Sequence, residues 1–205
     1  MKHNITINFE NLTDDDKKQL FEIAKKSTRS LTLADIEDGE IFKVADIEFI
    51  KFGETDGIVT AVAKDTLFDS PFGDNNNFGA SEVRAKLEND VLPKIERAVG
   101  EENVIGFVLD LLSLDGSDKW EKAFTKIGLP TFDFYRKNVK LFDKYKLDEW
   151  WWTATPNSTS EHASDNCIVC VSPSGYVDDG DGCYYYYGVR PFLLFVSSIS
   201  VSRGD

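Results

Sequence analysis

The residues best suited to chemistry gather near the C-terminal end of this 205-residue chain. Asp178, Asp179 and Asp181 place three carboxylates within four residues, a density that suits a hard cation such as calcium. No glutamate follows them to supply the bidentate ligand that calcium loops use. The run therefore favours a solvated turn, with calcium as the one cofactor left open and no other metal predicted.

The three cysteines lie in the same region. Cys167 and Cys170 have the C-x-x-C spacing, and His162 with Cys183 could complete a zinc set. The intervening Ile-Val pair favours a strand, which would point the first two thiols to opposite faces. Because the number of cysteines is odd and no secretory signal is visible, we expect reduced thiols and no zinc.

Four consecutive tyrosines, Tyr184 to Tyr187, follow the acidic run. In an extended segment alternate rings face opposite sides, so the four cannot all belong to a core. Tyrosine is large, rigid and able to hydrogen-bond, which makes it common on recognition surfaces. The chain has only two histidines, and no serine or cysteine nucleophile stands in a recognised motif. The sequence therefore predicts a binding function and no enzymatic activity.

The tail that carries these residues differs in composition from the rest of the chain. Lys, Glu, Gln, Met and Trp together number 37, and none occurs after Glu161. At uniform density the 44 residues that follow should hold about 8 of them. The tail is therefore under a constraint that the preceding residues do not share.

The elements that must position these residues indicate an α+β protein. Thr13 reads as a helix N-cap, and a connector from Ser30 separates a helical appendage, residues 1–30, from a main domain, residues 31–205. Period-two patterns predict strands at 41–44, 47–52, 57–62, 149–154, 167–172, 175–177 and 189–196, a buried strand at 104–114, and a turn or short helix at 119–124. Patterns at 80–89 and 91–99 predict two helices on a mainly antiparallel sheet. Trp150 to Trp152 must point to alternate faces of their strand, so we expect core packing.

Composition and charge exclude several classes of protein. The chain is 41% hydrophobic and 29% charged, which suits one substantial core. Its net charge of −13 repels phosphate backbones and anionic lipid, so no nucleic-acid partner is expected. The apolar runs fall short of the roughly 20 residues of a membrane span. Residues 1–9 also lack the apolar core of a secretory signal.

Two motifs carry a resemblance to a known family. Trp151-Trp-Thr-Ala-Thr-Pro156 is followed about 30 residues later by Gly188-Val-Arg-Pro-Phe192. This pattern resembles the variable proteins of diversity-generating retroelements, in particular their phage and gut-bacterial branch. The resemblance covers residues 35–200 in outline and is specific over residues 148–198. It implies a C-type lectin-like fold, in the variant related to formylglycine-generating enzymes, with a variable region at residues 160–190.

The missing residue types fit this resemblance. In such systems the adenines of a template repeat are copied with errors, and the usual template codon ends in an unaltered cytosine. Codons that end in C cannot encode Lys, Glu, Gln, Met or Trp, whereas they encode Tyr, Asp, Gly, Cys and Ser. The fixed framework residues of the tail would share the same absence by chance.

Carried over position by position, the resemblance divides the tail into variable and fixed residues. The diversified, ligand-binding positions would be Asp165, Cys167, Asp178, Asp179, Asp181, Cys183, Tyr184, Tyr185 and Tyr186. The framework would be Gly175, Tyr187, Gly188, Arg190 and Pro191.

The function that the resemblance implies is hypervariable binding of a protein or carbohydrate receptor on a cell surface. The protein would be a phage receptor-binding or tail-tip adhesin in the virion, or a protein displayed on the bacterial cell surface. The appendage could dock the domain or join copies into a homo-oligomer. Two alternatives stay open: an oxidase of the formylglycine-generating type, which uses cysteine thiols and a metal, and a calcium-dependent carbohydrate-binding lectin.

Overall fold

The structure is a computed structural model that describes residues 12–20, 30–178 and 182–204. The chain divides into two compact units, Met1–Leu31 and Thr32–Asp205, one residue from the boundary expected from the sequence. In the first unit a helix covers residues 14–20. Thr13 caps it as predicted, because its hydroxyl accepts from the Asp16 N–H at 3.1 Å while the Asp16 carboxylate accepts from the Thr13 N–H at 3.0 Å.

The second unit is α+β with mainly antiparallel sheets, which confirms the predicted fold class at that level. Its strands are β1 Ile41–Val44, β2 Ile47–Thr55, β3 Ile58–Ala63, β4 Asp69–Ser70, β5 Val104–Ile105, β6 Phe107–Asp110, β7 Lys122–Thr125, β8 Ile127–Gly128, β9 Trp151–Pro156, β10 Ile168–Val171, β11 Val177–Asp178, β12 Tyr187–Gly188, β13 Phe192–Val196 and β14 Ser202–Arg203. Its α-helices are α2 Glu82–Lys86, α3 Leu92–Val99, α4 Phe132–Lys137 and α5 Val139–Lys144.

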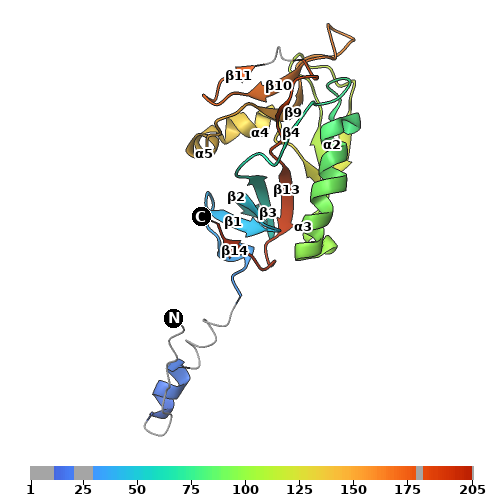
Figure 1. The fold of residues 1–205 in the computed structure, drawn as a ribbon. Helices are drawn as coiled ribbons and strands as arrows, with labels where there is room; N and C mark the ends of the chain where they lie inside the picture. Colours follow the sequence, from blue (N-terminus) through green and yellow to red (C-terminus); the bar gives the residue numbers. More distant parts are fainter. Residues whose placement is uncertain (1–11, 21–29, 179–181, 205) are drawn as a thin grey trace. The chain divides into compact units, whose positions relative to one another are not determined.

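These strands form three sheets. The largest has the order β14-β1-β2-β3-β13-β5, with β8 also paired to β13. A second sheet has the order β11-β10-β9-β12-β4, and β6 and β7 pair with each other in a third. The pairing of β9 with β12 is parallel. Figure 1 shows α4 and α5 between the two larger sheets and the helical run α2–α3 along one flank.

The two tryptophans of β9 point to opposite faces of its sheet, as the alternation predicted. Trp151 stacks on Phe142 of α5, with ring centroids 5.5 Å apart, and so joins the helices to the sheet. Trp152 contacts Phe72 edge-on at 5.7 Å, and its indole N–H donates to the Ser70 carbonyl at 2.9 Å. Because both indoles are buried, each face of the sheet is fixed by one large side chain.

The two helices predicted between residues 80 and 99 form one helical run that contains a π-helical turn, Leu87–Val91. The Leu92 N–H donates to the Leu87 carbonyl five residues back. Pro93 has no N–H for the Asn89 carbonyl, and a wide turn at this point accommodates the missing bond. The run ends at Gly100, which has φ of +92° as a helix-terminating glycine should.

The second unit has more helices than the two predicted on the sheet, because α4 and α5 follow the run. Both are short, and their aromatic residues gave no clear helical pattern. Thr131 caps α4 by accepting from the Phe134 N–H at 3.1 Å. Tyr135 and Phe142 are buried against the sheet. Tertiary packing therefore stabilises these helices more than their propensity does.

Residues 104–125 also differ from the prediction of a buried strand followed by a turn or short helix. They form β5, β6 and β7, and the exposed fraction of Val108 in β6 is 61%. The strand is interrupted between β5 and β6 at Gly106, where a β-carbon would collide with the Phe124 ring. The hairpin carries apolar residues on both faces, so its sequence did not reveal that one face remains open.

Candidate functional site

The four tyrosines lie in a tight turn and a short strand, and only Tyr187 is in a strand, β12. We call residues 182–187 the tyrosine turn. The Tyr185 N–H donates to the Gly182 carbonyl at 3.0 Å, which closes a β-turn. Tyr184, Tyr185 and Tyr186 expose 71%, 45% and 70% of their area. The turn therefore presents three adjacent rings to solvent, which the simple strand alternation did not predict.

A continuous aromatic stack supports two of these rings. Tyr184 lies against Tyr185 with centroids 4.9 Å apart, and Tyr185 stacks on Tyr187 at 6.0 Å with planes 10° apart. Tyr187 in turn contacts Trp150 at 5.6 Å and Trp152 at 4.6 Å. The exposed rings are thus joined to a buried indole, which restricts their motion and lowers the entropy lost on binding.

The first two residues of the tyrosine turn are held by backbone contacts. Gly182 pairs with Cys167 in an isolated antiparallel bridge, and the Cys183 N–H donates to the Asn166 carbonyl at 2.8 Å. The Cys183 carbonyl accepts from the Phe72 N–H at 2.7 Å. A β-carbon at Gly182 would collide with the Tyr184 ring. These contacts fix both the position and the direction in which the turn leaves the sheet.

Cys183 corrects the list of ligand-facing residues that the resemblance implied. Only 3% of its area is exposed, so its side chain lies beneath the tyrosine turn instead of on the surface. Burial raises the pKa of the Cys183 thiol to about 12, with a further contribution from Cys167. The thiol is therefore protonated at neutral pH, which is unsuited to nucleophilic or redox chemistry.

Asn76 holds the segment from Ser158 to Cys167 in place, a role that the sequence did not reveal. Its side-chain amide donates to the carbonyls of Ser158 at 2.8 Å and Cys167 at 2.7 Å, and its side-chain oxygen accepts from the Trp120 indole at 2.8 Å. Its backbone N–H donates to the Asp165 carbonyl at 2.7 Å. Since Asn76 is fully buried, its hydrogen bonds define the loop geometry strongly. The only feature of the sequence that drew attention to Asn76 was its place in an Asn-Asn-Asn run.

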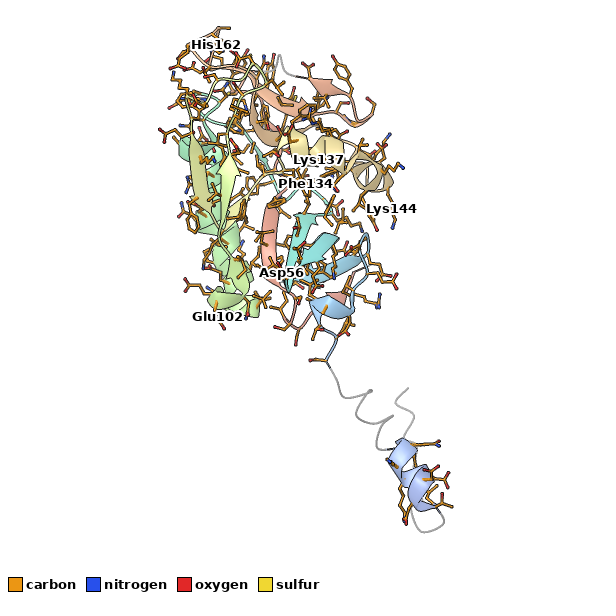
Figure 2. The ribbon with its side chains drawn as sticks, turned by 180° about the vertical axis from the view of Figure 1, so that it is seen from behind. Asp56, Glu102, Phe134, Lys137, Lys144 and His162 are labelled. Carbon is orange, nitrogen blue, oxygen red and sulfur yellow. The ribbon has the colours of Figure 1, made fainter. Side chains whose placement is uncertain are left out.

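Asp115 has four hydrogen-bond partners, one of them the Ser117 N–H at 3.3 Å, at the end of the domain that Figure 2 marks by His162. The hydroxyls of Ser113 and Ser158 each donate to the Asp115 carboxylate at 2.5 Å, and His162 Nδ1 lies 3.2 Å from it. These hydrogen bonds, that of Ser113 first, hold the pKa of Asp115 well below its usual range. Because Ser158 donates to the carboxylate and not to the imidazole, the trio lacks the serine-to-histidine contact of a catalytic triad.

The remaining predicted residues differ in their surroundings. Asp165 is half-buried, with its carboxylate 3.9 Å from the Lys119 ammonium, and Cys167 is also half-buried. Asp178 ends β11, where its carbonyl accepts from the Cys170 thiol at 3.5 Å. Asp179 and Asp181 lie outside the described residues. In the described parts of the chain, no three His, Cys, Asp or Glu residues are grouped to hold a metal ion.

Arg190 provides the physical reason for the Gly-Val-Arg-Pro motif. Its guanidinium lies over the rings of Phe142 and Trp151, 5.2 and 5.5 Å from their centroids, and Nε donates to the Ala63 carbonyl at 2.7 Å. Burial lowers its pKa to about 10, so it stays charged at neutral pH. Gly188 allows the close approach of this segment to Trp150, since a β-carbon would lie 3.2 Å from the Trp150 carbonyl.

Comparison with protein-family models, with curated proteins and with solved structures finds no match to this chain. Among the described residues, no helix combines the length and the apolar character that crossing a bilayer requires. The case for a function therefore depends on the residues and the geometry described above.

Proposed function

We propose that this chain is a variable ligand-binding protein of a diversity-generating retroelement, with a C-type lectin-like fold. Tyr184, Tyr185 and Tyr186 of the tyrosine turn would be diversified binding positions, together with Asp165, Cys167, Asp178, Asp179 and Asp181. Cys183 is a buried anchor in this proposal and not a ligand contact. The protein would bind its ligand non-covalently and would not be an enzyme.

The observation that carries the proposal is the exposure of Tyr184, Tyr185 and Tyr186 on one turn, two of whose exposed rings, Tyr184 and Tyr185, lie on a stack that ends at buried Trp152. A variable surface requires a scaffold that does not depend on the residues displayed. Here the buried side chains and the backbone bonds of Cys183 hold the turn, while the exposed rings contribute little to the core. Exposed substitutions usually change stability by no more than about 0.5 kcal/mol, so new residues would be tolerated.

The composition of the tail supports the same proposal independently. The segment without Lys, Glu, Gln, Met and Trp contains the tyrosine turn and most of its supporting backbone. Three exposed tyrosines in a row are difficult to explain as packing, whereas a template codon ending in cytosine yields tyrosine readily.

The ligand would be a protein or carbohydrate receptor on a cell surface, bound by a phage tail component or a bacterial surface protein. Aromatic rings would supply contact area, and aspartates would supply polar selectivity. The oxidase alternative requires ionised, accessible thiols, which the burial and raised pKa of Cys183 do not favour.

The experiment that tests this proposal is sequencing of the DNA on either side of the gene. We expect a reverse transcriptase gene and a near-copy of the region that encodes residues 160–190, differing from it mainly at adenines. A neighbourhood with neither of them, in a complete genome, would overturn the proposal.

A further inference from the structure

The hairpin β6–β7 carries a second group of exposed apolar side chains, away from the tyrosines in sequence. Val108 and Phe124 are cross-strand partners, and they expose 61% and 67% of their area. Leu112 and Leu114, which follow β6, expose 49% and 44%. A gathering of this kind on one hairpin typically marks an interaction site.

The outer edge of β6 has main-chain groups that point away from β7. The Leu111 N–H donates to the Glu121 carbonyl at 3.3 Å, so this pair is a hydrogen-bonded pair of the antiparallel ladder. Pairs alternate along such a ladder, and the register therefore turns the N–H and C=O of Val108 and Asp110 outward. In the described part of the chain, neither residue makes a backbone hydrogen bond to another element.

A groove runs along this edge. It consists of a cavity of about 240 Å³ beside β6 and a cavity of about 300 Å³ beside the residues that follow it. Both cavities are lined by Asp110 on one side and by Thr131 on the other. Phe134, marked near the middle of the domain in Figure 2, lines the first cavity, and Phe132 lines the second. The first cavity is thus mostly apolar, whereas the second also has polar and charged lining residues, and the Asp110 carboxylate belongs to both.

The charge of the groove favours a cationic guest. Asp133 and Arg136 neutralise each other, with a separation of 2.9 Å. Among the described residues, no lysine or arginine nitrogen lies within 4.0 Å of the Asp110 carboxylate, which accepts from the Leu112 N–H at 3.1 Å. The chain as a whole has a net charge of −13, which would steer a basic segment toward it.

We propose that this groove binds an extended segment of a partner protein, with alternating basic and apolar residues, as an added strand on β6. The Val108 and Asp110 main-chain groups would pair with the guest strand. An apolar side chain of the guest would enter the first cavity, the next inward-facing side chain would enter the second and more polar cavity, and a basic side chain would face Asp110. Residues 129–136 form the opposite wall, so a single extended segment fits better than the edge of a second folded copy.

The test uses the full-length protein and a fluorescent eight-residue peptide of alternating lysine with valine or isoleucine, at physiological salt. Fluorescence anisotropy should detect saturable binding. Val108→Pro removes an outward N–H and should weaken binding at least tenfold. Lys122→Pro is the control, because its N–H lies at the other edge of the hairpin, and it should bind at least as tightly as the wild type, since it also removes the cation opposite Asp110. Thermal unfolding of each variant shows that it is folded.

Two further arms separate strand addition from simple charge attraction. A peptide of the same sequence that is N-methylated at alternate residues keeps its charge but cannot pair along one edge, and it should bind at least tenfold more weakly. Asp110→Asn should weaken the unmodified peptide severalfold, and this arm applies even if Val108→Pro does not fold. Absence of binding by the wild type at 1 mM peptide (about −4 kcal/mol) would overturn the proposal. Equal binding of the methylated and unmodified peptides would also overturn the proposal. So would formation of a concentration-dependent dimer that excludes the peptide.

Discussion

Tyr187 stacks on Trp150 with ring centroids 5.6 Å apart and planes 20° from parallel, and this contact joins the tyrosine turn to the strand that begins at Trp151. It divides the tyrosines by role. Tyr187 is half-buried and belongs to the scaffold, whereas Tyr184 and Tyr186 are mostly exposed. The division leads to a direct comparison of single substitutions.

Tyr187→Ala should lower the free energy of unfolding by about 2–3 kcal/mol, because it removes contacts to Trp150 and Trp152. Tyr186→Ala, the matched control, should change it by no more than about 0.5 kcal/mol. Urea denaturation followed by tryptophan fluorescence measures both values. Equal losses in the two variants would show that the tyrosines are not divided into scaffold and display.

Asn76→Ala should lower the free energy of unfolding by about 2–4 kcal/mol, because it leaves the Trp120 indole N–H and the Ser158 carbonyl without this partner and removes one of the two hydrogen bonds to the Cys167 carbonyl. Asn75→Ala should cost about 0.5–1 kcal/mol, since the Asn75 side chain accepts one bond, from the Asn77 N–H. Chemical denaturation of the two variants provides the comparison. If Asn75→Ala were as destabilising as Asn76→Ala, the anchoring role of Asn76 would be wrong.

The depressed pKa of Asp115 predicts how stability depends on pH. A carboxyl group whose folded pKa is below its unfolded value stabilises the protein above the unfolded pKa, and this stabilisation decreases as the pH falls below about 4. The urea midpoint of the wild type should therefore fall more steeply between pH 5 and pH 2 than that of Asp115→Asn. Parallel curves for the two proteins would contradict the hydrogen-bonded role of Asp115.

The cysteines should differ in their reactivity. Cys183 is buried and its pKa is raised to about 12, so iodoacetamide should not modify it in native protein at pH 7.5. Half-buried Cys167 should react first. Peptide mass spectrometry after timed labelling measures the order. Rapid modification of Cys183 in folded protein would contradict this expectation and favour the oxidase alternative, which requires a reactive thiol.

The α+β class, the strand boundaries near β1, β2, β3 and β9 and the opposite faces of Trp151 and Trp152 could be predicted from the sequence, because these features depend on period-two alternation and on turn residues. The turn before β3 is an example: Asp56 and Gly57 both have positive φ, as the Asp-Gly pair indicated. Helices α4 and α5 could not be predicted, since they depend on the burial of Tyr135 and Phe142 against strand β9, which follows them in the chain.

The candidate site was predictable in part, for a similar reason. The composition of the tail pointed to Tyr184, Tyr185 and Tyr186, and the structure exposes all three. Burial of Cys183 depends on residues about 110 positions earlier in the chain, near Phe72, which no local pattern reveals. The same holds for Asn76, whose partners follow it by 44 to 91 positions.

The most direct test of the proposed variable surface is deep sequencing of this gene in a natural population of its source. We predict substitutions concentrated at Asp165, Cys167, Asp178, Asp179, Asp181 and Tyr184 to Tyr186, with Trp152, Tyr187, Gly188 and Arg190 unchanged. Identical residues at Tyr184 to Tyr186 across the population, or substitutions spread evenly over the gene, would contradict the account.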